Sequence, residues 1–273
     1  KDSLNDLTTG NHCAAFGLES ASKITTGNGV AAFGIYSGRY ATGNQWTFVG
    51  REAGEGVNGT TTAHDCTGVG HRCLTAITTS SNMTAMGSSA ASKVTTGSNS
   101  CIFGVEAARD LTTGSGVVAI GYNALKDART GNFFVCIGQT AGENISAGPH
   151  ITAVGYNCGR GASAGITGSN IVALGESIAI NLTSAINDVL VGNNAGNAIT
   201  DGGYCTAVGH EALRYNQSGD GNCAFGYRAL FGSSGTDPGF NCAFGYHSGR
   251  VITSGTFNVF MGYNSGDVVT TGA

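Results

Sequence analysis

A short internal repeat runs through the whole chain, and it constrains the fold more than any other feature of the sequence. An apolar residue followed by glycine recurs fifteen times, and ten of the fourteen spacings between these glycines are 17 residues. A fixed period of this kind indicates units that stack on their neighbours. The consensus glycines are Gly17, Gly34, Gly50, Gly70, Gly87, Gly104, Gly121, Gly138, Gly155, Gly175, Gly192, Gly209, Gly226, Gly245 and Gly262.

The residues around each consensus glycine follow a pattern, and we number their positions relative to that glycine. Position −1 holds only Phe, Val, Met, Ile or Leu, position −3 holds Ala, Thr, Val or Cys, and position +3 is almost always small. Positions +1 and +2 vary freely. Alternation of restricted and free positions is typical of a strand with one buried face. We therefore expect the large residue at −1 and the small residue at +3 to point into the interior.

The length of the repeat selects the fold class. Seventeen residues are too few for a strand followed by a helix, and no window shows the apolar spacing of a helix. The sequence predicts an all-β fold, a parallel β-solenoid of about fifteen coils of about 17 residues, in which short strands stack in register. We expect residues 1–273 to form a single repeat domain.

The composition predicts that partner chains stabilise this solenoid. Gly accounts for 46 of the 273 residues and charged residues for only 11%. If each coil buries one large apolar side chain, a single chain is marginally stable. We expect a row at position +4 to pack against neighbouring chains in a three-fold bundle, which is a simple closed assembly. The row comprises Ala21, Leu74, Ala91, Ala108, Leu125, Leu213 and Leu230.

Three units carry a resemblance to a known class of repeat. Residues 118–125 (VAIGYNAL), 206–213 (TAVGHEAL) and 222–230 (NCAFGYRAL) resemble the "NTAVGYxAL…TTG" repeats of phage tail fibres and trimeric surface proteins. They are also similar to the head repeats of trimeric autotransporter adhesins. The resemblance implies a left-handed parallel β-roll in a homotrimer. It further implies a structural and adhesive fibre shaft, part of a virion tail fibre or of an extracellular cell-surface appendage, that displays or contacts host-surface glycans.

Two other functions stay open. One is a polysaccharide-degrading tailspike segment of the lyase type, in which His210 with Glu211, and Arg228 with its neighbours, would supply a base and a cation for a uronate. The other is a self-assembling extracellular filament subunit. We expect no enzymatic activity and assign no catalytic residue.

A column of aromatic residues is the candidate carbohydrate-binding site. Position +1 holds His210, Tyr227, Tyr246 and Tyr263 in four successive coils, and equivalent positions of a solenoid stack. Aromatic faces beside hydrogen-bonding groups can hold sugar rings. The alternative is that stacked rings only stabilise the surface of the sheet or a trimer contact. The candidate residues are Tyr227, Tyr246, Tyr263, Arg228 and His247.

Charge and hydropathy exclude two classes of partner. The net charge of −4 leaves no basic surface for nucleic acid. No run of 18 apolar residues could insert into a membrane.

The nine cysteines and the histidines near them predict neither disulfides nor a metal site. Because Cys101, Cys223 and Cys242 occupy position −3 and Cys73 and Cys158 occupy position +3, we interpret these five as small buried residues. Two His-x-Cys pairs have the ligand chemistry of a zinc site, but their members are predicted to point apart. We therefore expect no metal and no cofactor. The pairs are His64 with Cys66 and His71 with Cys73.

Overall fold

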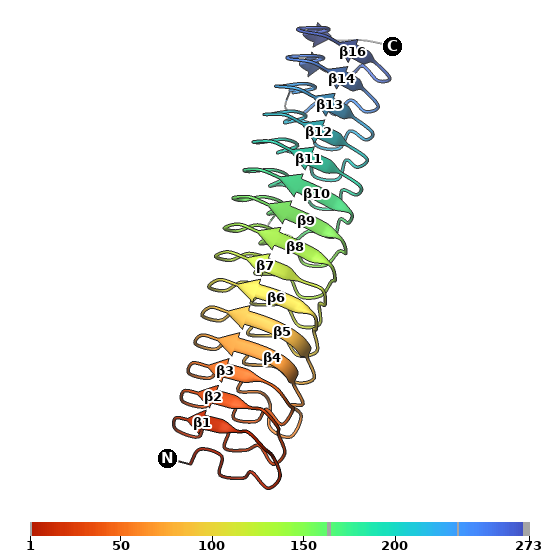
Figure 1. The fold of residues 1–273 in the computed structure, drawn as a ribbon. Coiled ribbons are helices and arrows are strands. Elements are labelled where there is room, and N and C mark those ends of the chain that lie inside the picture. The colour runs from red at the N-terminus through yellow and green to blue at the C-terminus, as the bar shows by residue number, and fades with distance from the viewer. Residues whose placement is uncertain (1, 163–164, 234, 270–273) are drawn as a thin grey trace. The chain divides into compact units, whose positions relative to one another are not determined.

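The structure, a computed structural model, describes residues 2–162, 165–233 and 235–269, and over these ranges it contains strands and turns but no helix. The chain is an all-β parallel β-solenoid of about fifteen coils, which confirms the predicted fold class (Figure 1). It divides into two compact units, Lys1–Phe134 and Val135–Ala273. Each unit is described by itself.

The first unit stacks one short strand per coil. Neighbouring strands pair in parallel, and the register places equivalent positions opposite each other, so that Ala14 pairs with Ala31 and Phe16 with Phe33. The strands are β1 (Ala14–Phe16), β2 (Ala31–Phe33), β3 (Thr47–Val49), β4 (His64–Val69), β5 (Ser81–Met86), β6 (Ser100–Phe103) and β7 (Val118–Ile120). A further strand, β8 (Phe134–Ile137), begins on the last residue of this unit.

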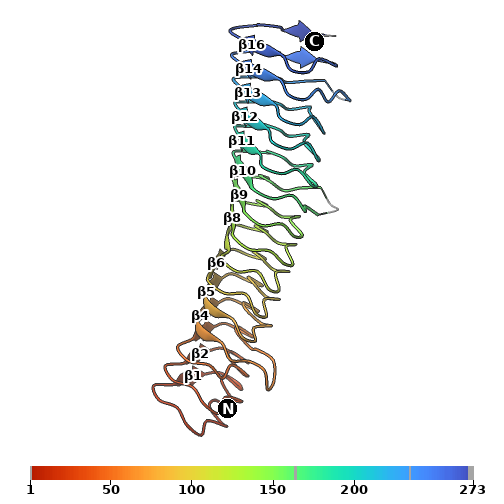
Figure 2. The same ribbon diagram turned by 90° about the vertical axis from the view of Figure 1, so that its right-hand side faces the viewer.

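The second unit repeats this arrangement. Its main sheet runs β9, β10, β11, β12, β13, β14 and β16, and β15 pairs with β17 beside it. Figure 2 shows that the strands of each unit gather on one side and the connecting turns on the other. The strands are β9 (Ile151–Val154), β10 (Ile171–Leu174), β11 (Val189–Val191), β12 (Thr206–Val208), β13 (Cys223–Phe225), β14 (Cys242–Phe244), β15 (Val251–Ile252), β16 (Val259–Met261) and β17 (Val268–Val269).

The consensus glycine is required where each strand ends. Gly104 has a φ of +138°, and a Cβ there would lie 2.3 Å from the carbonyl oxygen of Gly121 in the next coil. The amide N–H of Gly104 donates to the carbonyl of Met86 in the preceding coil at 2.8 Å. The coils therefore approach too closely at this corner for any side chain, which explains why glycine recurs at a single position of the repeat.

The structure confirms that strand residues alternate, but it reverses the predicted orientation of position −1. The residue at −2, such as Ala32 or Phe48, is fully buried, whereas Phe16 at −1 is 65% exposed. Because successive side chains of a strand point to opposite faces, burying −2 turns −1 and −3 outward together. The prediction that −1 points inward is wrong, and the prediction for +3 is confirmed by residues such as Ala107.

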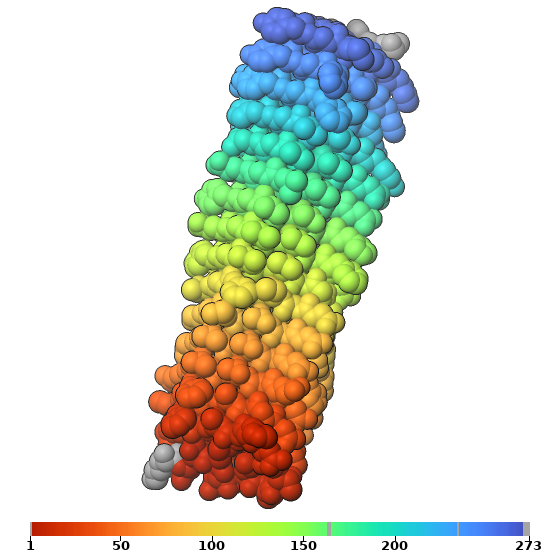
Figure 3. Space-filling view, viewed as in Figure 1, coloured from red at the N-terminus to blue at the C-terminus, as the bar shows by residue number. Residues whose placement is uncertain are grey.

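The interior is also better filled than the composition indicated. Residues at +4 are buried, so the prediction that this row packs against neighbouring chains is wrong. Positions −2 and +4 compensate in size: where one of them is bulky, the other is small in most coils. Gly68 with Leu74 and Phe48 with Gly54 are examples. A Cβ on Gly54 would lie 2.3 Å from the Phe48 ring. Since positions −4 and +7 add further buried side chains, most coils are filled layers. Figure 3 shows the coils of each unit as successive bands on the outer surface.

The cysteines divide according to the same alternation. Cys73 and Cys158 at +3 are buried, as predicted, and burial raises the pKa of each thiol to about 12. The prediction of burial is wrong for position −3, where Cys101 and Cys223 are half-buried and Cys242 is exposed. These three lie on the outer face of their strands for the reason given above. All nine cysteines are free thiols.

Candidate functional site

The predicted aromatic column lies in the second unit, directly after strands β12, β13, β14 and β16. The rings stack nearly parallel: Tyr227 and Tyr246 have centroids 4.9 Å apart, and their planes differ by 17°. His210 stacks on Tyr227 at 5.3 Å, and Tyr263 stacks on Tyr246 at 5.4 Å. The ring faces are therefore largely covered by one another, and the column presents ring edges and phenol hydroxyls to solvent.

Glu211 anchors an ionic cluster beside this column. Its side chain is almost fully buried, and it accepts a hydrogen bond from Arg228 Nε at 2.5 Å and another from Arg214. Burial alone would raise the pKa of Glu211, but the hydrogen bond from Arg228 and the charges of both arginines outweigh it and lower the pKa. The same hydrogen bond raises the pKa of Arg228. Glu211 is thus held as a carboxylate that is shared by Arg214 and Arg228.

His247 completes the group of predicted residues. Its ring lies 4.2 Å from the Tyr246 ring centroid and 5.4 Å from that of Tyr227. Burial of the imidazole and the positive charge of Arg250 lower its pKa, which favours the neutral form. The Arg228 guanidinium lies over the Tyr227 ring at 5.1 Å. The structure therefore brings Tyr227, Tyr246, Arg228 and His247 into contact, with Tyr263 at the next step of the column.

This arrangement suits recognition better than proton transfer. Glu211 and the two arginines together carry one net positive charge, and the ionised Glu211 cannot donate a proton at neutral pH. The phenol hydroxyls and ring edges form a rigid polar row. The assignment of these residues to carbohydrate binding stays a prediction.

A second surface, which the sequence analysis assigned to the core, is the outer face of the strands. We define the strand face as the side chains at positions −3 and −1, which are all apolar, Thr or Cys, and none of which is charged. Phe16 is 65% exposed in the first unit, and Phe244 is 59% exposed in the second. Phe16 stacks on Phe33 at 5.3 Å in the first unit, and Phe225 lies 6.0 Å from Phe244 in the second, so rings contact each other where phenylalanines occupy −1 of adjacent coils.

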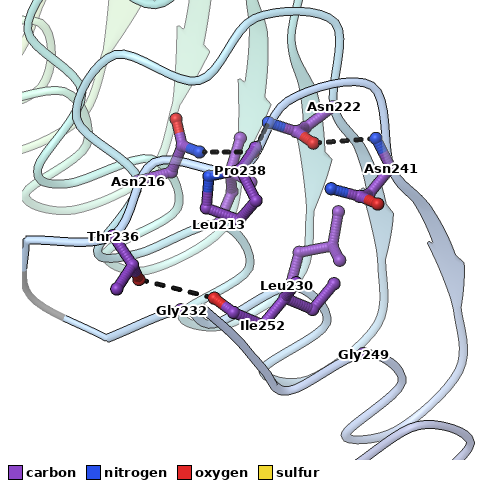
Figure 4. Close-up of a pocket in the computed structure, with 10 residues that line it drawn as sticks. All are labelled: Leu213, Asn216, Asn222, Leu230, Gly232, Thr236, Pro238, Asn241, Gly249 and Ile252. Atoms are coloured by element: carbon purple, nitrogen blue, oxygen red, sulfur yellow. Dashed lines mark hydrogen bonds between the residues drawn. The ribbon is translucent and has the colours of Figure 1, made fainter. Parts of the chain in front are cut away.

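A partly open cavity lies beside Gly232, Thr236 and Pro238, where one coil is lengthened, and it is too small to hold a substrate (Figure 4). Its volume is about 10 Å³, which is room for one water molecule. Asn216 donates to the carbonyl of Pro238 at 3.2 Å across this cavity, and its own buried side-chain oxygen has no protein partner. The cavity therefore fits a structural water.

The residues considered for zinc do not converge. Cys66 and Cys73 are buried, whereas His64 and His71 are exposed. Among the residues that the structure describes, no group of three or more His, Cys, Asp and Glu side chains could hold a metal ion. The same residues contain no helix with the length and apolar character needed to cross a membrane.

Comparison with known proteins finds nothing similar to this chain, whether among family models, curated proteins or solved structures. We therefore infer the function from the surfaces described above.

Proposed function

We propose that the chain is a structural fibre shaft that assembles with copies of itself through the strand face and contacts glycans through other surfaces. The observation that carries this proposal is the strand face, on which position −1 is apolar in every described coil, position −3 holds an apolar residue, Thr or Cys, and neither position carries a charge. Exposed apolar surfaces that extend over many residues mark sites of protein contact.

The filled interior strengthens the case for self-association. Most coils already bury the residues at −4, −2, +3, +4 and +7, although Val57 at +7 is 45% exposed, so the apolar residues at −1 and −3 are not needed for the core. A second copy presents the same apolar columns at the same coil spacing. Because hydrophobic contact is non-directional and grows with buried area, many coils in register add to one interface. A homotrimer is the closed assembly that we favour, on a virion tail fibre or an extracellular appendage.

The molar mass of the full chain in solution tests this proposal. Light scattering after gel filtration should give three times the chain mass. Phe33→Glu, which places a charge on the strand face, should shift the assembly to monomer. The matched control is Thr26→Glu, because Thr26 is exposed on a different side of the same coil. A wild-type chain that is monomeric at every concentration would refute the proposal.

The two alternatives give different results in simple assays. A lyase would produce unsaturated uronates from acidic polysaccharides, which ultraviolet absorbance detects, and such turnover would replace the purely structural role. An open-ended filament would appear by electron microscopy as particles of unlimited length, which is incompatible with a closed trimer.

A further inference from the structure

The first unit carries an unbroken ladder of threonines on a surface distinct from the strand face. Position −8 holds threonine in all eight coils of this unit. The residue at position −7 is mostly buried, so the side chains at −8 and −6 both face outward. We call these two columns the threonine face. The threonines are Thr9, Thr26, Thr42, Thr62, Thr79, Thr96, Thr113 and Thr130, and the second column is Asn11, Asn28, Asn44, His64, Ser81, Ser98, Ser115 and Asn132.

The hydroxyls of this ladder are free, unlike those of the adjacent threonines at position −9. The −9 hydroxyls donate to the carbonyl of the next coil, as Thr78 does to Thr95 at 2.7 Å and Thr112 to Arg129 at 2.7 Å. Within the described part of the first unit, Thr42 is the one −8 residue whose hydroxyl bonds to a protein group, the carbonyl of Thr61. Seven hydroxyls are therefore available, at a spacing of about 4.8 Å along the coils.

The second column is held in a fixed orientation. The side-chain oxygen of Asn28 accepts from the amide N–H of Asn11 at 3.1 Å, and that of Ser98 accepts from the amide N–H of Ser81 at 3.1 Å. Asn28 Nδ2 also donates to Asn44 Oδ1 at 3.4 Å, which leaves its second amide hydrogen and the hydroxyl hydrogen of Ser98 as available donors. The threonine face thus presents preorganised donors and acceptors, and neither column contains Asp, Glu, Lys or Arg.

The surface is also hollowed. Residues of both columns from Thr9 to His64 line a groove of about 480 Å³, in which Thr, Gly and Asn recur in three successive coils. A concave, uncharged surface with one set of hydrogen-bonding groups per coil fits a long neutral polymer of hydroxyl-bearing units. Each contact is weak, but many identical contacts along one chain add through effective concentration.

We propose that the threonine face binds a neutral, extended polysaccharide that lies along the stacked coils. This inference rests on the glycan-contact part of the proposed function and names a ligand class and a surface for it. Between Thr9 and His64 the groove favours a polymer over ice, because a concave surface does not match a flat crystal face.

The test measures binding of the full chain to a soluble glucan, a mannan and a galactan, with polygalacturonate as the acidic comparison. The triple variant Thr26→Val, Thr62→Val and Thr96→Val removes three hydroxyls while keeping side-chain shape. We expect wild type to bind at least one neutral polymer, more tightly as its length grows, and the variant to bind about tenfold more weakly or worse. The control is Thr167→Val, at the same position in the second unit, which should leave binding unchanged.

Several outcomes would overturn the inference. The inference fails if wild type binds no neutral polymer, or if it binds polygalacturonate more tightly than the neutral polymers. It also fails if the triple variant keeps its thermal midpoint and binds as tightly as wild type. Ice shaping without polymer binding would likewise overturn it. Loss of binding in Tyr246→Ala but not in the triple variant would assign the glycan site to the aromatic column instead. A trimer that binds no neutral polymer refutes this inference alone, whereas a monomer that binds one refutes only the proposed assembly.

Discussion

Asp188 gives the sharpest prediction, because it is a buried carboxyl group with one oxygen unpartnered, at a position where later coils carry asparagine. It occupies position −4, where Asn222 and Asn241 stand in later coils. The side-chain oxygen of Asn222 accepts from the amide N–H of Asn241 at 3.0 Å, and Asp188 Oδ1 accepts in the same way from the amide N–H of Cys205 at 2.8 Å. The other carboxyl oxygen of Asp188 is buried without a partner.

The equivalent asparagines show which hydrogen bonds the unpartnered oxygen of Asp188 does not make. The amide nitrogen of Asn222 donates to the carbonyls of Gly219 and Pro238 at 3.1 and 2.9 Å. A carboxylate at the equivalent position can only accept, so it has to be protonated to make such a bond. Burial and, more weakly, the charge of Asp220 raise the pKa of Asp188 to about 7, against a smaller lowering by the Cys205 hydrogen bond.

The raised pKa fixes the sign of the pH dependence. Below about pH 4 the carboxyl is protonated in both the folded and the unfolded chain and costs nothing. Between about 4 and 7 only the unfolded chain ionises, so the free energy of unfolding falls as pH rises. Above about 7 both states are ionised and the penalty is constant. Three pKa units correspond to about 4 kcal/mol as an upper value.

Asp188→Asn should remove this penalty. We expect the variant to exceed wild type in free energy of unfolding by about 2–4 kcal/mol at pH 8, and the difference to shrink toward zero near pH 4. Denaturant unfolding followed by circular dichroism across that range measures it. Asp201→Asn, which changes an exposed carboxylate, is the control and should show no comparable difference. A stability difference for Asp188→Asn that does not vary with pH would refute the reasoning.

Two further predictions concern the backbone corner and the aromatic column. Gly104→Ala combines an unfavourable φ with a collision against the Gly121 carbonyl, so it should destabilise the chain by about 3 kcal/mol or more, whereas Gly59→Ala, with nothing within 4 Å, should cost about 1–2 kcal/mol. Equal losses in a denaturant titration would contradict the steric argument. Tyr246→Ala removes stacking on both neighbouring rings and should cost about 1–3 kcal/mol. An unchanged thermal midpoint would mean that the column contributes no stability.

The repeat predicted the fold class and the coil length, because the period is a property of the sequence itself. The repeat does not show in the same way which face of each strand is buried. Large apolar residues at −1 resemble a core column, and an alternating strand gives no indication of which face is inside. The signal that was available is the size compensation between −2 and +4, seen in Gly68 with Leu74 and Phe48 with Gly54.

The candidate site shows a similar limit. The stacking of Tyr227 on Tyr246 follows from the repeat, since equivalent positions of a solenoid lie one above another. The pairing of Glu211 with Arg228 follows in the same way, since both occupy position +2 of adjacent coils, whereas the contact of Glu211 with Arg214 depends on the path of the corner. The difference between free and bonded threonine hydroxyls likewise depends on backbone orientation, which adjacent residues of identical type cannot reveal.

The outward turn of position −1 changes the argument for assembly. A thin core would require partner chains merely to complete the fold, but the filled interior of each coil removes that requirement. An apolar column that the fold does not need, such as Phe16 stacked on Phe33, costs solubility unless another surface covers it. The threonine face presents hydroxyl and amide groups, whereas the strand face is mainly apolar. The two surfaces therefore differ in chemistry along the same coils. This separation leaves the threonine face open to a ligand when copies of the chain join through the strand face.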